Sequence, residues 1–218
     1  MMKVLVGCEI SGIVRDAFLA RGHDAWSCDL KPCEAVSNRH IVGDVLDVMQ
    51  DEWDLLAVMH PPCTRLCNSG VRWLTKPPKG KTLDQMWREL EQGCGLFSAV
   101  WNVPHIPRVA VENPVMHRHA KERIENFKPA SQSVQPWQFG TSEAGPDNER
   151  KRTCLWLRNL PNLKPTGTLD GSTARQSVAF SSPSSDRGQI RSRFFPGLAA
   201  AMADQWGNLA EETSKHAA

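Results

Sequence analysis

The sequence lacks any run of about 18 apolar residues, so it predicts no membrane-spanning helix. It also lacks the marks of a secretory signal, because polar and charged residues follow the short apolar run at the amino terminus without a small-residue cleavage site. Hydrophobic residues make up 40% of the 218 positions and charged residues 23%, a balance typical of a globular protein with one sizeable core. We therefore expect a cytoplasmic protein.

Cysteine pairs with metal-binding spacing are also missing. The sequence has seven cysteines but no Cys-x-x-Cys, and its nearest pairs are Cys28 with Cys33 and Cys63 with Cys67. Zinc sites are built from closely spaced ligand pairs, so we predict no metal site. An odd number of cysteines without a signal peptide fits a reducing compartment better than a disulfide framework.

No strong charge of one sign and no internal repeat marks the chain. The net charge is +2 at pH 7, which by itself indicates no class of partner. Between residues 147 and 193, however, the sequence has nine Lys or Arg and four acidic residues. This segment is either a surface that binds a polyanion or a solvated face, and the sequence leaves both interpretations open.

Short apolar strands alternate with helix-like segments along most of the chain. We predict strands at 3–7, 23–29, 40–43, 54–59, 108–111 and 153–157, and helices after Ser11, over 83–103 and from about 196 onward. This alternation is typical of an α/β protein with a mostly parallel, twisted sheet and helices on both of its faces.

The composition divides the chain into three parts. We predict an α/β core over 1–145, a small basic lobe over 146–195, and a C-terminal helix over 196–218 that packs back on the core. If its basic residues bind a polyanion and not water alone, the lobe would be a minimal contact for nucleic acid. Within it, 163–187 is rich in Ser, Thr, Gly and Pro and is predicted as a flexible loop.

Acidic residues end two of the predicted strands. Asp29 closes the second strand and Asp44 follows the third. A carboxylate at the first position can accept hydrogen bonds from both ribose hydroxyls, and one at the second can accept an exocyclic amine of a base, which favours nucleoside binding. The turn after the first strand, Gly7-Cys8-Glu9-Ile10-Ser11-Gly12, lacks a full GxGxxG, which argues against a pyrophosphate in that turn.

The apolar run that ends at Met59 is followed by His60-Pro61-Pro62-Cys63. Prolines cannot continue a sheet ladder because they lack the N–H, so Cys63 is predicted to lie just past the carboxyl end of a strand. In open α/β sheets this is where ligands bind, and a thiol there is placed for chemistry. The alternative is that Cys63 is a small buried hydrophobe, the commonest fate of a free cysteine.

A second polar break, Glu112-Asn113-Pro114, follows the strand predicted at 108–111. The Asn-Pro step forces an extended turn at the same edge of the sheet as Cys63. We therefore expect a thiol and a carboxylate to leave adjacent strand ends. The alternative is a glutamate that caps a helix or faces solvent.

Taken together, these segments resemble the DNA cytosine-5 methyltransferases, and more narrowly the short versions common among phages and prophages. Pro62-Cys63, with Gly70 seven residues after the cysteine, is similar to the family's nucleophile loop, and Glu112-Asn113-Pro114 is similar to its Glu-Asn-Val segment. The resemblance covers roughly residues 3 to 157. It implies a Rossmann-like class I methyltransferase fold and a protein that acts in the cytoplasm of a bacterial host.

The resemblance implies transfer of a methyl group from S-adenosylmethionine to carbon 5 of cytosine in DNA. Cys63 would add to carbon 6 and make carbon 5 enamine-like, while Glu112 would hold N3 and the exocyclic amine. A base inside a duplex is unreachable, so it would be flipped out. Arg150, Lys151 or Arg152 would contact the pyrimidine from the other side.

The resemblance also implies which residues bind the two ligands. Pro62, Asn113 and Pro114 would contact the substrate. The cofactor would be held by Gly7, Cys8, Glu9, Ile10, Ser11, Gly12, Asp29, Leu30, Asp44, Val45 and Pro61.

The sequence departs from the family at two points. The usual serine four residues after the nucleophile is Cys67, and only about 35 residues lie between Leu157 and Arg193, where typical members carry a large target-recognition lobe. Sequence specificity would then be low, come from a partner or from a second copy in a homodimer, or be absent because the substrate is smaller. Two alternatives stay open: the same chemistry on RNA or a free pyrimidine nucleotide, and a non-catalytic nucleic-acid-binding protein.

Overall fold

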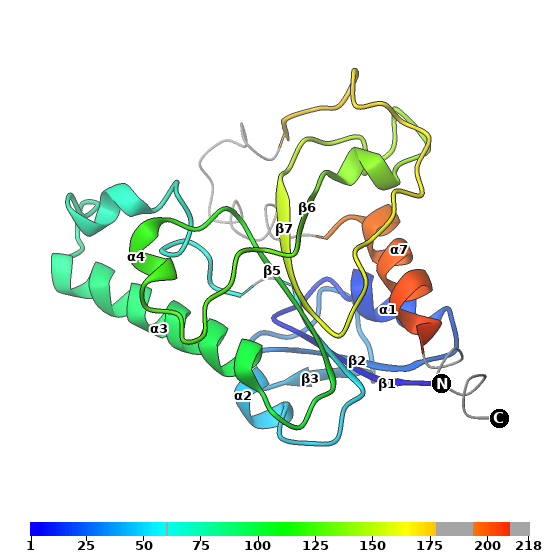
Figure 1. The fold of residues 1–218 in the computed structure, drawn as a ribbon, viewed down its shortest axis with the longest axis horizontal. Helices are drawn as coiled ribbons and strands as arrows, with labels where there is room; N and C mark the ends of the chain where they lie inside the picture. The colour runs from blue at the N-terminus through cyan, green and yellow to red at the C-terminus, as the bar shows by residue number, and fades with distance from the viewer. Residues whose placement is uncertain (60, 178–193, 210–218) are drawn as a thin grey trace.

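A seven-stranded sheet with the order β3-β2-β1-β4-β5-β7-β6 organises the residues that the computed structural model describes, which are 1–59, 61–177 and 194–209 (Figure 1). The strands are β1 (Lys3–Gly7), β2 (Asp24–Asp29), β3 (His40–Val42), β4 (Leu55–Val58), β5 (Arg108–Asn113), β6 (Gln132–Val134) and β7 (Thr153–Arg158). The helices are α1 (Ile13–Leu19), α2 (Val45–Val48), α3 (Leu83–Asn102), α4 (Arg118–Lys121) and α7 (Pro196–Gly207), with 3-10 turns η1 (Val71–Leu74) and η2 (Pro136–Phe139).

Five strands of the sheet run parallel. β1 pairs with β2 and β4, β2 with β3, and β4 with β5, all in parallel, whereas β7 pairs antiparallel with both β5 and β6. The predicted α/β class with a mostly parallel sheet is therefore confirmed. Along the chain, β2 is added next to β1 and β3 next to β2, and β4 then pairs with the other edge of β1. The strand order thus reverses between β1 and β4, where doubly wound sheets bind their ligands.

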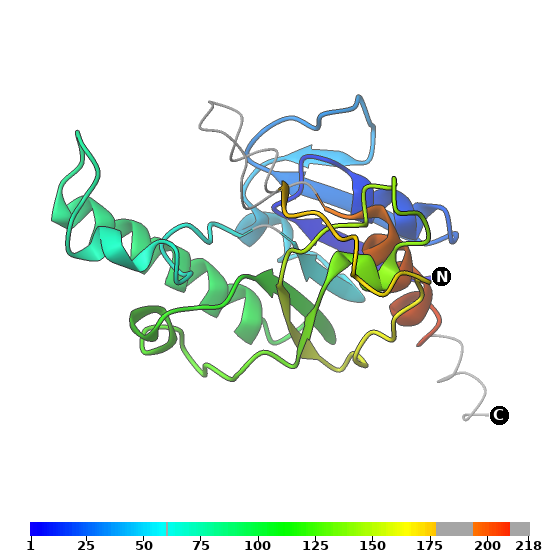
Figure 2. The same cartoon turned by 90° about the horizontal axis from the view of Figure 1, so that it is seen from above.

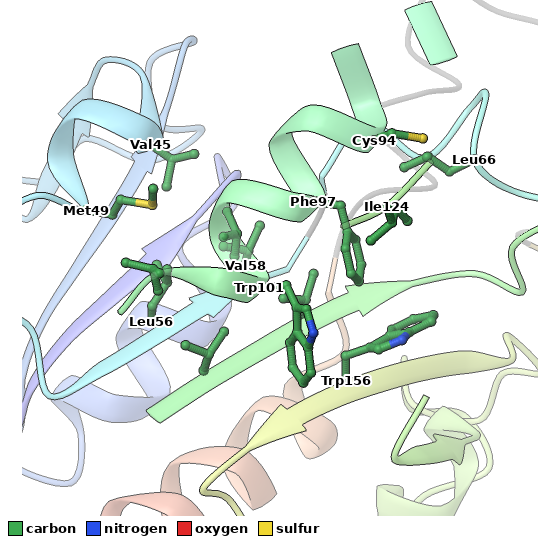
Figure 3. Packing of buried hydrophobic residues seen from close by; sticks show 14 of the residues in the cluster. Val45, Met49, Leu56, Val58, Leu66, Cys94, Phe97, Trp101, Ile124 and Trp156 are labelled. Carbon is green, nitrogen blue, oxygen red and sulfur yellow. The ribbon is translucent and has the colours of Figure 1, made fainter. Parts of the chain in front are cut away.

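Helices cover both faces of the sheet. On one face α1 and α7 lie side by side and share a core with Leu55 and Ala57 of β4 (Figure 1). On the other face α2 and α3 cover Leu56 and Val58 (Figure 3). This alternation along β4 is that of a strand buried on both sides, as expected for a parallel sheet. None of the described helices is long and apolar enough to cross a membrane.

Helix α3 is the longest helix of the described chain and supports the loop that carries Cys63. It begins with a capping box in which Thr82 and Gln85 satisfy each other's backbone amides. Its C-terminal half packs on the sheet, where the ring of Phe97 meets that of Trp156 edge-on at 5.3 Å (Figure 3). Its N-terminal half extends past the strands, beside the segment that follows β4 (Figure 2).

Two glycines allow the loop after β4 to pack closely. At Gly93 of α3 a Cβ atom would lie 3.2 Å from the carbonyl oxygen of Pro62, so the helix lacks a side chain where the loop crosses it. At Gly70 a Cβ atom would lie 1.7 Å from the carbonyl oxygen of Thr64, which excludes any side chain there. The compact course of 61–70 therefore depends on these glycines.

The structure differs from the sequence prediction at the antiparallel edge of the sheet. Strand β6 was not predicted, and β5 extends past Val111, so that Glu112 pairs with Leu155 and Asn113 with Cys154. The extra length comes from β7, which supplies backbone partners to residues that would otherwise end the strand. Glu112 thus lies inside a strand and not in a turn after it.

The segment predicted as a flexible loop at 163–187 is only partly described. Its first part is held in place by backbone bonds from the Gly167 amide to the Gln138 carbonyl oxygen and from the Arg175 amide to the Asn148 carbonyl oxygen, at 2.9 and 3.0 Å. Residues 178–187 lie outside the described residues, as do 210–218 of the predicted C-terminal part. The helix predicted from about 196 is confirmed as α7.

Candidate active site

A cleft of about 910 Å³ opens at the carboxyl ends of β1, β2 and β3, between the loop that follows β4 and helix α3. It lies beside the point where the strand order reverses. Its volume falls within the range of about 300–1,000 Å³ that is usual for small-molecule sites. It is lined by Cys8, Cys28, Asp29, Leu30, Gly43, Asp44, Val45, Leu46, Pro62, Thr64, Arg65, Glu89, Gln92, Gly93, Gly95 and Leu96.

Only some of the residues predicted to bind the cofactor form the described wall of this cleft. Those that do are Cys8, Asp29, Leu30, Asp44 and Val45, together with Pro62, which was predicted to contact the substrate. Those that do not are Gly7, Glu9, Ile10, Ser11, Gly12 and Pro61.

Two carboxylates stand at neighbouring strand ends in the cleft. Asp29 Oδ1 accepts the amide of Lys31 at 3.0 Å, and Asp44 Oδ1 accepts the amide of Leu46 at 2.9 Å as the N-cap of α2. These bonds fix the direction of both side chains. Gly7 contributes through packing, because a Cβ there would lie 2.6 Å from Val45 and would push α2 away from the sheet.

In the turn between β1 and α1, the side chain of Glu9 folds back onto the backbone amides at the start of α1. Glu9 is fully buried, and its carboxylate accepts the amide of Val14 at 2.7 Å, the amide of Arg15 at 3.3 Å and the hydroxyl of Ser11 at 3.2 Å. Burial raises the pKa of Glu9 to about 7, against the effect of these hydrogen bonds. The amino end of α1 is thus satisfied from within the chain, and the side chain of Glu9 serves the helix and not the cleft.

Arg65 places a buried positive charge in the wall of the cleft. The residue is 8% exposed, and its Nε donates to Glu89 of α3 at 2.8 Å, while Lys81 donates to the other oxygen of Glu89 at 2.6 Å. Its Nη1 is buried and has no hydrogen-bond partner among the described residues. An unpaired buried donor costs roughly 1–3 kcal/mol. Because Arg65 lines the cleft, this donor lies near the space that a bound ligand would fill.

The loop with Cys63 is joined to the segment after Glu112 by backbone hydrogen bonds. The amide of Asn68 donates to Val115 at 3.1 Å, and the amide of His117 donates to Leu66 at 3.0 Å. These two bonds form a short antiparallel bridge outside the main sheet. Because β4 and β5 are also direct neighbours, the thiol and the carboxyl group arrive at the same edge.

The side chains of Cys63 and Glu112 lie within electrostatic range of each other. Burial raises the pKa of Glu112, which is 4% exposed, to about 7, while the positive charge of Lys151 opposes the shift. A hydrogen bond to Cys67, burial and the charge of Glu112 raise the pKa of Cys63 above its usual value, and Lys151 again opposes the shift. Cys63, Cys67, Glu112 and Lys151 thus form one cluster, which we call the thiol–carboxyl cluster.

Of the three basic residues predicted to contact the substrate, the structure brings one to this cluster. Lys151 acts on both Cys63 and Glu112. Arg150 instead donates to the carbonyl oxygen of Gly171 at 2.8 Å, and Arg152 donates to Ser133 at 2.9 Å. All three residues precede β7, and their side chains have different partners.

The predicted substrate residues after Glu112 have different surroundings. Asn113 is fully buried, and neither atom of its carboxamide has a hydrogen-bond partner in the described part of the chain. Its register partner Cys154 belongs to the core beneath α3, whereas Leu155, the partner of Glu112, belongs to the core beneath α1 and α7. Asn113 and Glu112 therefore face opposite sides of the sheet. Pro114 is half-buried.

His117 was not singled out from the sequence, although it holds the loop in place. Its Nδ1 accepts the amide of Ala120 at 3.2 Å, which leaves Nε2 to donate to the carbonyl oxygen of Arg65. Burial lowers its pKa, in keeping with a neutral ring. The sequence offers no local signal for this contact, because 52 positions separate the two residues.

All seven cysteines are free thiols. In the described residues, no group of three or more His, Cys, Asp or Glu side chains is arranged to hold a metal ion.

A scan of the chain against models of known protein families found no match. A search of curated proteins found no significant match either.

We predict that Arg65 contributes to ligand binding in the cleft. Arg65→Met should weaken binding of S-adenosylhomocysteine, the demethylated form of the expected cofactor, by roughly tenfold or more, because a hydrogen bond from a charged donor is worth about 1.5–3 kcal/mol. Isothermal titration calorimetry on the folded variants measures this directly. Arg72→Met, which removes an exposed guanidinium stacked on Trp73, is the control and should bind like the wild type. Equal affinities for all three proteins would rule out the role of Arg65.

Proposed function

We propose that this protein is a methyltransferase that transfers a methyl group from S-adenosylmethionine to carbon 5 of cytosine in DNA. The observation that carries the proposal is the thiol–carboxyl cluster. Cys63 and Glu112, which are 49 residues apart in the sequence, lie within electrostatic range of each other and of Lys151. Pro62 and Thr64, on either side of Cys63, belong to the described wall of a nucleoside-sized cleft, whereas the residues of the cluster do not.

The described residues of the cleft fit S-adenosylmethionine. Asp29 and Asp44 offer carboxylates at the ends of β2 and β3, which suits ribose hydroxyls and an exocyclic amine. Arg65 Nη1 is a donor that has no partner among the described residues. When bound, this cofactor supplies an electrophilic methyl group on a sulfonium. Pro62 lies in the wall one residue before Cys63, so the cofactor and the nucleophile would share one loop.

Carbon 5 of cytosine is a poor nucleophile, and the residues of the cluster are of the types that can make it more reactive. The sulfur of Cys63 forms a bond to carbon 6, and the electron pair of the 5,6 double bond moves toward N3 and leaves carbon 5 enamine-like. Glu112 in its acid form donates a proton to N3, while its other oxygen accepts the exocyclic amine. Once carbon 5 carries the methyl group, its proton would pass to water and the sulfur–carbon bond would break with its electron pair returning to the sulfur of Cys63. N3 would return its proton to Glu112, which restores the base.

The ionisation of Glu112 is matched to this role. With a pKa of about 7, roughly half of the carboxyl groups carry a proton at neutral pH, whereas an ordinary glutamate would carry almost none. Lys151, whose charge acts on both Cys63 and Glu112, would stabilise negative charge on the ring or on the leaving thiolate.

Nucleic acid as the substrate is supported by the basic residues around the cluster. Arg150 and Arg152 are exposed and would contact phosphates, while Lys151 would face the base. A duplex substrate requires the cytosine to be flipped out. The proposal includes a cytoplasmic location in a bacterial cell infected by or carrying a phage, where seven free thiols would stay reduced.

The test is covalent trapping with DNA that contains 5-fluorocytosine, since fluorine at carbon 5 cannot leave as a cation and the Cys63 adduct persists. We expect a donor-dependent adduct with the wild type and with Cys33→Ser, and none with Cys63→Ser. Mass spectrometry locates the modified residue.

Two further arms separate the alternatives. An adduct that forms with 5-fluorodeoxycytidine monophosphate or with RNA, but not with DNA, would show that the nucleotide or RNA is the substrate. The absence of an adduct with every substrate, in a folded protein that still binds DNA, would favour a non-catalytic nucleic-acid-binding protein.

The acid role of Glu112 predicts a particular pH profile. Because its pKa is raised, the acid form is present below about pH 7 and is lost above it, so the turnover number should fall as pH rises through that range. Glu112→Gln should lower the turnover number about 100-fold or more and abolish this descending limb, with little change in DNA affinity. The exposed Glu125→Gln is the matched control and should keep the wild-type profile. Equal losses of turnover and affinity in Glu112→Gln would indicate a structural glutamate.

A further inference from the structure

A second pocket, of about 390 Å³, lies between the segment that follows β6 and the loop over 170–172. We call it the lobe pocket. It shares no lining residue with the cleft beside α3, and it contains neither Cys63 nor Glu112. Its volume is within the range that is usual for small-molecule sites. The residues that line it are Gln135, Trp137, Arg150, Asp170, Gly171 and Ser172.

Hydrogen bonds within the chain hold the walls of the lobe pocket in place. The backbone amide of Arg150 donates to the carbonyl oxygen of Arg175 at 2.7 Å. The carboxamide of Asn148, which is 1% exposed, donates to the carbonyl oxygens of Glu143 and Thr173 at 2.9 and 3.3 Å. The segments on either side of the pocket are thus joined without a ligand, so a ligand would meet a site that is already formed.

Gly171 brings an aromatic ring and a cation to the same place. Its φ is +80°, and a Cβ atom there would lie 2.6 Å from the ring of Trp137, so glycine lets this turn lie against the indole. The carbonyl oxygen of Gly171 accepts Nη2 of Arg150 at 2.8 Å. Trp137 is half-buried, and its indole gives the pocket an aromatic wall against which a planar ligand can stack.

Arg150 and Asp170 give the pocket two opposite charges that do not neutralise each other. Oδ1 of Asp170 accepts the amide of Ser172 at 2.8 Å, and hydrogen bonds from Ser172 lower the pKa of Asp170, which keeps it an anion at neutral pH. Within the described chain, Nε and Nη1 of Arg150 have no acceptor, and Arg150 and Asp170 form no ion pair. A phosphate would meet the carboxylate as well as the guanidinium, so a neutral ligand with both donors and acceptors suits the pocket better.

The two charged groups set the pattern that such a ligand must have. A guanidinium only donates hydrogen bonds, and a carboxylate only accepts them. Among the bases, guanine carries the acceptor O6 beside two donors, the N1 and N2 N–H groups. Adenine and cytosine have an acceptor next to their amine, and thymine and uracil have one N–H between two carbonyl oxygens. Guanine is therefore the base that matches this pair of charges along one edge.

We propose that the lobe pocket binds a guanine base, which stacks on Trp137, accepts from Arg150 at O6 and donates from N1 and N2 to Asp170. The identity of the base rests on the pocket alone. That the base belongs to a nucleic-acid strand rests on the proposed function, since Arg150 directly precedes Lys151 of the thiol–carboxyl cluster. Arg150 would then contact a base in place of a phosphate, which leaves the phosphate contact to Arg152.

The experiment measures the affinity of the full chain for fluorescein-labelled single-stranded DNA by anisotropy, without a methyl donor. The strand is a run of thymidines with one guanine at its centre, and a matched strand carries inosine there. Inosine differs from guanine only in lacking the N2 amine, so the comparison isolates one donor to Asp170. We expect the wild type to bind the guanine strand about tenfold more tightly, as for a hydrogen bond to a charged group.

Asp170→Asn should bind the two strands equally. Asparagine keeps an oxygen that accepts the Ser172 amide, but it lacks the second acceptor that a pair of donors requires. The matched control is Glu143→Gln, which removes one negative charge from an exposed side chain of the same region outside the pocket. It should keep the tenfold preference for guanine.

Competition with dGMP and with deoxyinosine monophosphate distinguishes the two sources of the base. Preferential binding of dGMP, with no preference between the strands, would assign the pocket to a free guanine nucleotide and overturn its assignment to a strand. A folded wild type that does not distinguish guanine from inosine in either form, or a folded Asp170→Asn that still does, would overturn the guanine site altogether.

This measurement involves neither Cys63 nor a donor, so the two proposals can fail separately. A preference for guanine without a trapped 5-fluorocytosine adduct would defeat the methyltransferase and leave the guanine site. A trapped adduct without a preference for guanine would defeat only the guanine site.

Discussion

The arrangement of this molecule depends on the short bridge between two loops, in which the amide of Asn68 bonds to Val115 and that of His117 bonds to Leu66. The loops leave neighbouring strands but are distant in the sequence, and without the bridge each would be free to move away from the sheet edge. The bridge holds Cys67 opposite Met116 and so fixes the turn that begins at Cys63. The neutral ring of His117 adds a third link, through the carbonyl oxygen of Arg65.

Two sets of contacts then determine the surroundings of Cys63 and Glu112 at this edge of the sheet. On the side of α3, the absence of a side chain at Gly93 lets the loop approach the helix, and the pair of Arg65 with Glu89 fixes it there, so that the loop becomes one wall of the cleft. On the side of β7, Lys151 brings a positive charge to a region where burial disfavours the anions of Cys63 and Glu112. Burial thus favours the neutral thiol and the neutral carboxylic acid, and the positive charge of Lys151 opposes both shifts.

Local signals in the sequence were sufficient for the parallel half of the fold. Apolar runs with abrupt ends predicted β1, β4 and the length of α3, because periodicity and proline act within a few residues. The antiparallel strands were harder to predict from the sequence. Strand β6 has only three residues, and the extension of β5 depends on pairing with β7 about 40 residues later. Such pairings are set by tertiary contacts that no local pattern records.

The same distinction applies to the candidate site. Cys63, Asp29 and Asp44 could be selected because each follows a strand end that is visible in the sequence. The sequence could not separate Lys151 from Arg150 and Arg152, since the partners of the two arginines, Gly171 and Ser133, lie in other segments of the chain. Glu9 was predicted to bind the cofactor, but its burial against α1 is evident only once the helix is placed. The contact of Arg65 with Glu89 joins residues 24 positions apart and has no signature in either segment.

The central claim is that Cys63 and Glu112 act on one pyrimidine and make its carbon 5 reactive. Release of tritium from DNA labelled at carbon 5 of cytosine measures that event directly, because the label leaves only after the thiol has added and carbon 5 has been substituted or protonated. We expect tritium release by the wild type in the presence of S-adenosylmethionine and none by Cys63→Ser. If the label stays in the DNA after incubation with the folded wild-type protein, or if both proteins release it equally, the joint action of Cys63 and Glu112 on the pyrimidine is contradicted.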